Sequence, residues 1–346
     1  MNLVPGDHDG AEDPDRVLEL FLGFWVSRTV MAAVELGVFE VLDHERAGEG
    51  LTVGQAEAAL GLRRRPARAL LDTCVAVGLL VKEDGRYRTS GLGARYLTSR
   101  SPVSLRNYVL DERWCWPAWG RLEEALRADH QLLPEDEEGY HAFPEDFFLD
   151  FLHGHSRVMG DRLAAAVDLS GVRRMMDVGG GSGAVSIALC SAFPELEAVV
   201  VDQPPVAARA GHHIAAAGLA GRITTWPANM FDDPLPAGCD VAVVANVLHD
   251  FSPERARELL GRVHDALPPG GRVLILEIVP DDERRGPPLA VVFAVAMIVN
   301  TAGGDAHTVP QYREWLEAAG FAGVRVTPIP GRMVTTVIEA TKPPPP

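Results

Sequence analysis

A glycine-rich turn is the part of the sequence whose residue types point most directly to ligand chemistry. Residues 176–184 read M-D-V-G-G-G-S-G-A, so an apolar run and the acid Asp177 lead through the glycines into the helical pattern of residues 184–193. Glycine tolerates positive φ and lets a ligand approach the backbone, and the helix that follows offers unpaired N–H groups and the positive end of its dipole. The sequence predicts a strand, a tight turn and a helix that bind a nucleotide-like ligand at Gly179 and Gly181.

Further apolar strands follow, and polar residues stand at their ends. Residues 199–201 run into Asp202, where an acid would hold a ribose about one βαβ unit after the turn. Residues 240–248 run into His249 and Asp250, and the turn L-P-P-G-G-R precedes an apolar strand over residues 273–278. The glycine pattern alone would also fit a dinucleotide site, but NAD would require this turn in the first unit of the chain and would not account for the later motifs.

His249 is the residue whose position best fits proton transfer. It lies just past the end of a predicted parallel strand, and ligands bind at that edge of an open sheet. A neutral imidazole there can remove a proton from a phenol or an acid near neutral pH. A lone histidine is more often structural, so the position at the strand end is what favours the catalytic interpretation.

The ordered series of motifs resembles the class I S-adenosylmethionine-dependent methyltransferases, and more specifically the plant-type and bacterial small-molecule O-methyltransferases. The resemblance is carried by MMDVGGGSGAV, VVVDQPPV, MFDDPLP, VLHDFSP, LPPGGRVLILE and GGDAHTVPQYREWLEAAGF. It implies that Asp177 faces the sulfonium and amino end of the cofactor, Asp202 the ribose, and Asn229 and Met230 the adenine. The remaining cofactor contacts that we expect are Ser156, Gly179, Gly181, Gln203, Phe231 and Asn246.

The same resemblance implies that His249 is the general base, with Asp250 beside it and an acid holding the imidazole. Here the chain departs from the family pattern. The plant enzymes carry G-G-K-E-R-T, whereas residues 303–308 read G-G-D-A-H-T, so Ala306 stands where the orienting glutamate is expected. We expect Glu277 to orient His249 alone, or with Asp305 as a displaced substitute.

The departure also adds His307, and residues 152–156 supply two more histidines, which leaves the chemistry open. His249, His307 and either His153 or His155 could converge into a site for a divalent or trivalent metal ion. Such a metal would acidify C3 of a 2-oxo acid and allow C-methylation. O-methylation of a phenolic acceptor, this metal-assisted C-methylation, N-methylation and a non-methylating use of the cofactor remain alternatives.

The N-terminal part reads as a small helical unit. Residues 17–36 have apolar side chains at helical spacing, residues 65–77 predict a second helix, and residues 79–88 predict a hairpin with an Asp-Gly turn. This is a winged-helix pattern, which resembles the dimerisation domain of the same methyltransferases. We expect a homodimer, because the apolar face of residues 17–36, with Phe21 and Trp25, is too wide for so small a unit to bury.

Composition limits the other classes of function. The 346 residues carry a formal net charge of −16, which opposes nucleic-acid binding and a DNA-binding regulator. The four cysteines are far apart and predict neither disulfides nor a zinc site. The N-terminus does not read as a signal peptide, and residues 289–299 are only long enough for a core helix, so we expect no membrane span and a cytoplasmic location.

Together these patterns predict an α/β fold, a Rossmann-like doubly wound domain with an N-terminal α-helical winged-helix dimerisation domain. The predicted boundaries are tails at 1–14 and 343–346, a dimerisation domain at 15–104, a helical connector and acceptor-pocket lid at 105–166, and a catalytic domain at 167–342. The predicted function is S-adenosylmethionine-dependent methylation of a small molecule, phenolic or oxo acid, in bacterial secondary metabolism.

Overall fold

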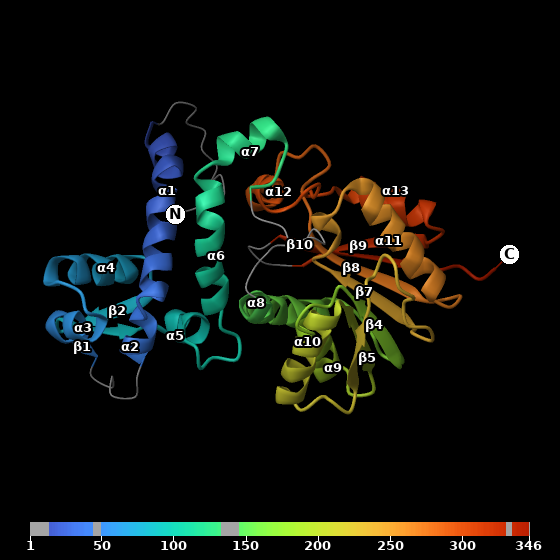
Figure 1. Ribbon diagram of the computed structural model, residues 1–346, viewed down its shortest axis with the longest axis horizontal. Helices are drawn as coiled ribbons and strands as arrows, with labels where there is room; N and C mark the ends of the chain where they lie inside the picture. The colour runs from blue at the N-terminus through green and yellow to red at the C-terminus, as the bar shows by residue number, and fades with distance from the viewer. Residues whose placement is uncertain (1–13, 44–49, 133–144, 330–333, 346) are drawn as a thin grey trace. The chain divides into compact units, whose positions relative to one another are not determined.

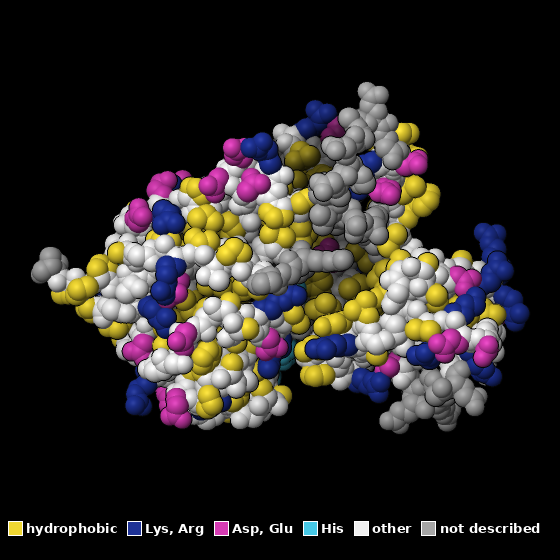
Figure 2. All heavy atoms as spheres, turned by 180° about the vertical axis from the view of Figure 1, so that it is seen from behind, with side chains coloured by type: hydrophobic (Ala, Val, Ile, Leu, Met, Phe, Trp, Pro, Cys, Tyr) yellow, Lys and Arg dark blue, Asp and Glu magenta, His cyan; other side chains and the backbone are white. Residues whose placement is uncertain are grey.

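The computed structural model describes residues 14–43, 50–132, 145–329 and 334–345, and the chain divides into two compact units between Trp116 and Pro117 (Figure 1). This division falls inside helix α6, Arg106–Trp119. The finer domain boundaries predicted from the sequence remain predictions. Apolar side chains lie among scattered charges of both signs on the face drawn in Figure 2.

The first unit is a helical bundle with a small antiparallel sheet of order β1-β3-β2. An Asp84-Gly85 turn with positive φ at both residues joins the two longer strands, as the Asp-Gly signal predicts. Thr52 and Gln55 form a capping box at the start of α3. The elements are α1 (Pro14–Glu35), α2 (Val38–Asp43), β1 (Leu51–Thr52), α3 (Val53–Leu60), α4 (Arg64–Ala76), β2 (Leu80–Glu83), β3 (Arg86–Thr89) and α5 (Gly91–Leu97).

Helix α1 leaves large apolar side chains uncovered within this unit. Phe21 is 66% exposed and Trp25 is 58% exposed, whereas Ala33 and Val34 near the other end of the helix are buried. By length and composition alone, α1 is also able to cross a membrane, so the expectation that no segment reaches that length is wrong. The reason is that apolar residues are spread around much of this helix, which raises its mean hydropathy above that of an ordinary amphipathic helix.

The second unit is built on a seven-stranded sheet of order β6-β5-β4-β7-β8-β10-β9. The first five strands in this order are parallel, and β10 is antiparallel to both of its neighbours. Strands β4, β7 and β8 are almost wholly buried, as expected for a parallel sheet that is covered on both faces. The strands are β4 (Arg174–Val178), β5 (Glu197–Asp202), β6 (Ile223–Pro227), β7 (Val241–Ala245), β8 (Arg272–Ile278), β9 (Ala322–Pro328) and β10 (Thr335–Thr341).

Helices cover both faces of this sheet, and each face has its own apolar core. One core joins the sheet to α8 and α9 and the other joins it to α11 and α13, which lie on opposite sides of the strands in Figure 1. The helices are α7 (Leu122–Ala128), α8 (Glu145–Ala166), α9 (Ala184–Ala192), α10 (Pro204–Ala216), α11 (Pro253–Ala266), α12 (Pro288–Asn300) and α13 (Val309–Ala318).

The strand order reverses at β4, whose neighbours are β5 on one side and β7 on the other. In doubly wound sheets, ligands bind beyond the carboxyl ends of the strands at such a switch point. The chain leaves β4 through the glycine turn and leaves β7 toward His249. The topology therefore brings the two strongest sequence signals to one edge of one sheet.

Candidate active site

The glycine turn after β4 has the geometry that its sequence predicts. Gly179, Gly181 and Gly183 have φ of +69°, +55° and +73°, and the N–H of Gly179 donates to the carbonyl of Val201 at 2.9 Å. A Cβ at Gly179 would lie 2.7 Å from Cγ2 of Val247, whereas a Cβ at Gly181 would meet no atom within 4 Å. Packing therefore requires glycine at 179, while open space lies beside the backbone at 181.

Asp202 at the end of β5 holds this turn in place. Its Oδ2 accepts from the N–H of Gly181 at 2.8 Å and its Oδ1 accepts from the N–H of Gln203 at 2.8 Å. Burial raises the pKa of Asp202, although these two hydrogen bonds oppose the rise. A carboxylate oxygen has more than one acceptor site, so the same group is able to accept hydroxyl donors from a ligand.

Asp177 lies beneath the turn, fully buried, where it accepts a hydrogen bond from Oγ of Ser186 at 2.7 Å. Burial raises its pKa to about 6. The side chain is therefore tied to the first turns of α9, and its predicted contact with the sulfonium end of a cofactor remains a prediction. Ser156 is half-buried on α8 and Gln203 lies at the start of α10, and their contacts with a cofactor also remain predictions.

The turn after β6 is built by its own side chains. Oδ1 of Asn229 accepts from the N–H of Phe231 at 3.0 Å, and its Nδ2 donates to Oδ2 of Asp232 at 2.8 Å. The Nε of Arg262 donates to the carbonyl of Met230 at 2.8 Å. The amide of Asn229 thus shapes this loop, and the ring of Phe231 is buried against Phe251 with a centroid distance of 5.0 Å.

His249 lies in a short 3₁₀ helix, Leu248–Asp250, just beyond β7. Its Nδ1 is 2.5 Å from Oε2 of Glu277, a carboxylate at the end of β8 that is 0% exposed. Oε1 of Glu277 accepts from the N–H groups of Val247 and Leu248 at 3.0 and 2.9 Å. Asn246, with φ of +55°, donates from its N–H to the carbonyl of Leu276 and so starts this link between the two strands.

The environment of His249 makes its imidazole a strong base. Burial by itself lowers its pKa, but the negative charges of Glu277 and Asp250 outweigh burial and raise the pKa to about 9. Oδ1 of Asp250 lies 3.4 Å from Nε2, and the ring of Phe293 lies edge-on with a centroid distance of 4.9 Å. Because Nδ1–H donates to Glu277, the lone pair of a neutral His249 is on Nε2, where a substrate proton would be accepted.

The segment that replaces the plant-type motif contacts the backbone of His249. The N–H of Asp305 donates to the carbonyl of His249 at 3.0 Å, and a Cβ at Gly304 would lie only 2.2 Å from that carbonyl oxygen. Ala306 is buried, and because alanine carries no acidic group, this position offers no carboxylate to the ring of His249. Glu277 is hydrogen-bonded to the ring of His249, whereas Asp305 contacts the main chain of His249.

The structure does not support the predicted metal site with His153, His249 and His307. His307 is 0% exposed, with its ring edge-on to Trp315 at 4.8 Å, and burial lowers its pKa. Nδ1 of His153 lies 2.9 Å from Oγ of Ser182, and its ring stacks on that of His213. Among the described residues, no three histidine, cysteine, aspartate or glutamate side chains are grouped so as to hold a metal ion.

His155 is the histidine of α8 that is electrostatically coupled to the base. Burial, Arg162 and His249, in decreasing order, lower the pKa of His155 to about 4, so its imidazole is neutral at physiological pH. The sequence suggested His155 as the alternative to His153 in a metal site with His249 and His307.

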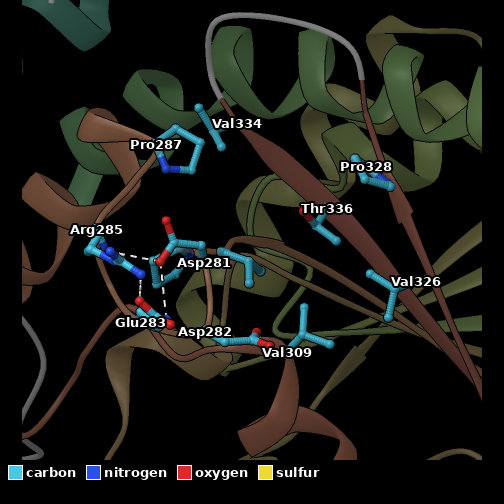
Figure 3. A pocket seen from close by; sticks show the side chains of 12 residues that line it. Asp281, Asp282, Glu283, Arg285, Pro287, Val309, Val326, Pro328, Val334 and Thr336 are labelled. Atoms are coloured by element: carbon cyan, nitrogen blue, oxygen red, sulfur yellow. Dashed lines mark hydrogen bonds and ion pairs between the residues drawn. The ribbon is translucent and has the colours of Figure 1, made fainter. Parts of the chain in front are cut away.

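A separate open hollow lies beyond the end of β8 (Figure 3). One side carries the acidic residues Asp281, Asp282 and Glu283 with Arg285, and the other is mostly apolar, from β9, β10 and the start of α13. None of the described residues that line it is a histidine or a cysteine. The side chains suited to proton transfer lie instead at the ends of β7 and β8.

Comparison with known proteins agrees with this geometry. Residues 139–322 match the O-methyltransferase domain, and residues 18–99 match the O-methyltransferase dimerisation domain. The chain is 42% identical to 3-hydroxy-5-methyl-1-naphthoate 3-O-methyltransferase of Streptomyces sahachiroi over 90% of each chain. It is 34% identical to L-tyrosine C(3)-methyltransferase of Streptomyces lavendulae over 90% of this chain and 88% of the relative.

Among solved structures, human N-acetylserotonin methyltransferase in complex with S-adenosylmethionine matches with a TM-score of 0.86 and 30% identity, over 97% of this chain and 99% of that one. The fold and site thus define an S-adenosylmethionine-dependent methyltransferase. The chain belongs to the O-methyltransferase family, with its dimerisation domain and its catalytic domain both present.

Proposed function

We propose that this protein methylates a hydroxyl group on an aromatic small molecule and that His249 is the general base. The observation that carries the proposal is the pair formed by His249 Nδ1 and Glu277 Oε2 at 2.5 Å, at the end of the strand next to the glycine turn. A base in this position serves an acceptor whose proton must leave, as a phenol's must.

The residues of the glycine turn fit S-adenosylmethionine. The open space at Gly181 admits a ligand against the backbone, and Asp202 offers carboxylate oxygens beside it. S-adenosylmethionine, when bound, supplies a methyl group made electrophilic by a sulfonium. We propose that Asp202 and Gln203 bind its ribose, that residues 229–231 flank its adenine, and that Asp177, Ser156 and Asn246 complete its surroundings.

The chain's own part in the reaction is to hold and move one proton. Nε2 of neutral His249 accepts the proton of the acceptor hydroxyl, and the ring becomes an imidazolium. Glu277 stabilises that cation through the hydrogen bond at Nδ1, and Asp250 adds a second negative charge. Phe293 covers the imidazole edge-on and limits access of water to this face.

The acceptor class follows from the relatives as a proposal. The Streptomyces sahachiroi relative is named for a 3-hydroxy-5-methyl-1-naphthoate, so we propose a bicyclic or monocyclic aromatic hydroxy acid of bacterial secondary metabolism. The match to the dimerisation domain and the uncovered apolar side chains of α1 support a homodimer. A cytoplasmic location is part of the same proposal.

C-methylation of an aromatic ring is the second candidate, because a relative at 34% identity is named L-tyrosine C(3)-methyltransferase. The same base would serve it, since removal of a phenol proton places negative charge on the ring carbons as well as on oxygen. This candidate needs no metal ion, unlike the oxo-acid chemistry considered from the sequence.

The test is a product assay. Purified protein is incubated with S-adenosylmethionine and a panel of hydroxynaphthoic acids, naphthols and tyrosine, and S-adenosylhomocysteine and methylated products are measured by mass spectrometry. The proton NMR shift of the new methyl group distinguishes O-methyl from C-methyl products. Methylation at oxygen supports the proposal, methylation at carbon supports the second candidate, and methylation only of amines contradicts both.

A further inference from the structure

An ion pair involves Asp305, the residue whose N–H donates to the carbonyl of His249. The two terminal nitrogens of Arg284 donate to the two carboxylate oxygens of Asp305 at 3.0 and 2.8 Å, and one of them also donates to Oε1 of Gln311 at 3.3 Å. Two parallel bonds from one guanidinium fix direction as well as distance. The ion pair therefore defines where the segment around Asp305 lies.

The loop that carries Arg284 is itself closely fixed. Oδ1 of Asp281 accepts from the N–H groups of Glu283 and Arg285 at 3.1 and 2.9 Å, and the N–H of Asp281 donates to the carbonyl of Gly286 at 2.6 Å. Arg284 lies in this turn with φ of +55°, which is uncommon for a residue with a side chain. The turn holds the start of the arginine side chain in one place.

The segment around Asp305 in turn holds the main chain of His249. The N–H of Asp305 donates to the carbonyl of His249 at 3.0 Å, and Oδ1 of Asp305 accepts from the N–H of Ala306 at 2.7 Å. Glu277 also holds this stretch, through the N–H groups of Val247 and Leu248 and through the ring of His249. Glu277 and Arg284 both belong to β8 and the turn after it, so one segment of chain contacts His249 directly through Glu277 and indirectly through Asp305.

We infer that Arg284 and Asp305 are positioning residues for His249, and that their ion pair replaces the orienting acid that is absent at Ala306. The inference rests on the proposed role of His249 as the base. Both side chains are 38% exposed, so their ion pair contributes little to the stability of the fold. The ion pair acts on the position of His249, because a small misplacement of a reacting group lowers the reaction rate far more than it lowers the stability of the fold.

The experiment compares Arg284→Gln, Arg284→Lys, Asp305→Asn and the double variant Arg284→Gln/Asp305→Asn. We expect kcat to fall about tenfold in the glutamine and asparagine variants, while the Kd for S-adenosylmethionine and the KM for the acceptor stay unchanged. Lysine keeps the positive charge but cannot make the two parallel hydrogen bonds of the guanidinium, so Arg284→Lys is expected to retain part of kcat. The double variant should be no slower than either single variant, because both remove the same contact.

A measurement without any acceptor separates positioning from a merely structural role. The imidazole of His249 is titrated by NMR with ¹³C-labelled histidine, and its signal is assigned by its loss in His249→Asn. In the variants, a looser approach of the ring to Glu277 should lower its pKa from about 9 toward its ordinary value. Arg325→Ala, which removes an ion pair with Glu339 at 2.9 Å on the far strands, is the matched control and should change neither readout.

An unchanged titration with an unchanged kcat overturns the inference. So does a fall in kcat with an unchanged titration and a raised acceptor KM, which would mean that the ion pair serves the acceptor. If the titration moves as expected but His249→Ala retains full activity, the positioning of the ring by Arg284 and Asp305 stands and the proposed catalytic role of His249 fails.

Discussion

Nδ1 of His249 lies 2.5 Å from Oε2 of Glu277, and Oε1 of the same carboxylate accepts from the N–H groups of Val247 and Leu248. Glu277 is 0% exposed, and a buried carboxylate is costly unless it is paired. One side chain thus fixes both the ring and the turn that carries it. The arrangement favours the protonated imidazole and leaves the lone pair of the neutral one on Nε2.

Replacement of the base should remove most of the chemistry and little of the binding. His249→Ala is expected to lower kcat by about 10²- to 10⁴-fold, the usual contribution of a positioned general base. The Kd for S-adenosylmethionine, measured by calorimetric titration, should stay unchanged because the hydrogen bonds of Gly179 and Asp202 are made with groups other than His249. His212→Ala, an exposed histidine on α10, is the control. A turnover near that of the wild type in His249→Ala would contradict the assignment.

The raised pKa of His249 sets the direction of the pH dependence. The base must be neutral to accept a proton, and its pKa is about 9, so kcat/KM should rise with pH up to that value and level off above it. Glu277→Gln removes the main charge that raises the pKa. In that variant the rising limb should move toward the ordinary histidine value of about 6.5, and the plateau should fall because the imidazolium loses its partner. If the rising limb of the kcat/KM profile did not move in Glu277→Gln, a group other than His249 would control it.

The turn at Gly181 can be tested against a glycine with the same backbone constraint elsewhere. Gly181→Val should weaken binding of S-adenosylmethionine at least about tenfold, which is about 1.4 kcal/mol, because the side chain fills the space where the ligand approaches the backbone. Gly171→Val is the control, because Gly171 also has positive φ, +83°, and a Cβ there would meet no atom within 4 Å, but this glycine lies before β4. Equal affinity in the two variants would argue against a cofactor at this turn.

Much of the catalytic unit could be predicted because each strand carries its own signal. The glycine turn, Asp202 and His249 each follow a short apolar run, and the carboxyl ends of parallel strands meet at one edge. The metal triad is not supported by the described residues, because its three histidines come from separate segments and sequence spacing does not show which way their rings point. Arg284 gave no signal, since an arginine in a charged turn usually faces solvent. Its contact with Asp305 depends on how the turn after β8 packs on the segment before α13.

The exposed face of α1 should be an interface between two copies of the chain. Burial of one large apolar side chain is worth about 1.5–3 kcal/mol, so Phe21→Glu combined with Trp25→Glu should convert a dimer into a monomer at micromolar concentration. Sedimentation velocity measures the change, and Leu92→Glu, an exposed leucine on α5, is the control. Because α1 is also long enough to cross a membrane, flotation with lipid vesicles is the companion measurement. Flotation of the wild type together with a monomer in solution would refute the dimer interface.

Two adjacent glycines give the sharpest test of the segment that replaces the plant-type motif. A Cβ at Gly304 would lie 2.2 Å from the carbonyl oxygen of His249 and 2.5 Å from Oγ1 of Thr301, whereas a Cβ at Gly303 would lie 3.4 Å from Cβ of Ser252. Gly304→Ala must therefore displace either this segment or the backbone of His249. A displacement of about 1 Å can lower a rate by about 10²-fold, so kcat should fall far more than the thermal stability does.

Gly303→Ala has space for its methyl group and should keep both kcat and Tm close to the wild type. The two variants differ by one position and by the same methyl group, so composition and helix propensity cannot account for a difference between them. Steady-state kinetics with the acceptor and a thermal unfolding scan give the two readouts. If Gly304→Ala were as active as Gly303→Ala, the hydrogen bond from Asp305 to the carbonyl of His249 would not be part of what keeps the base in place.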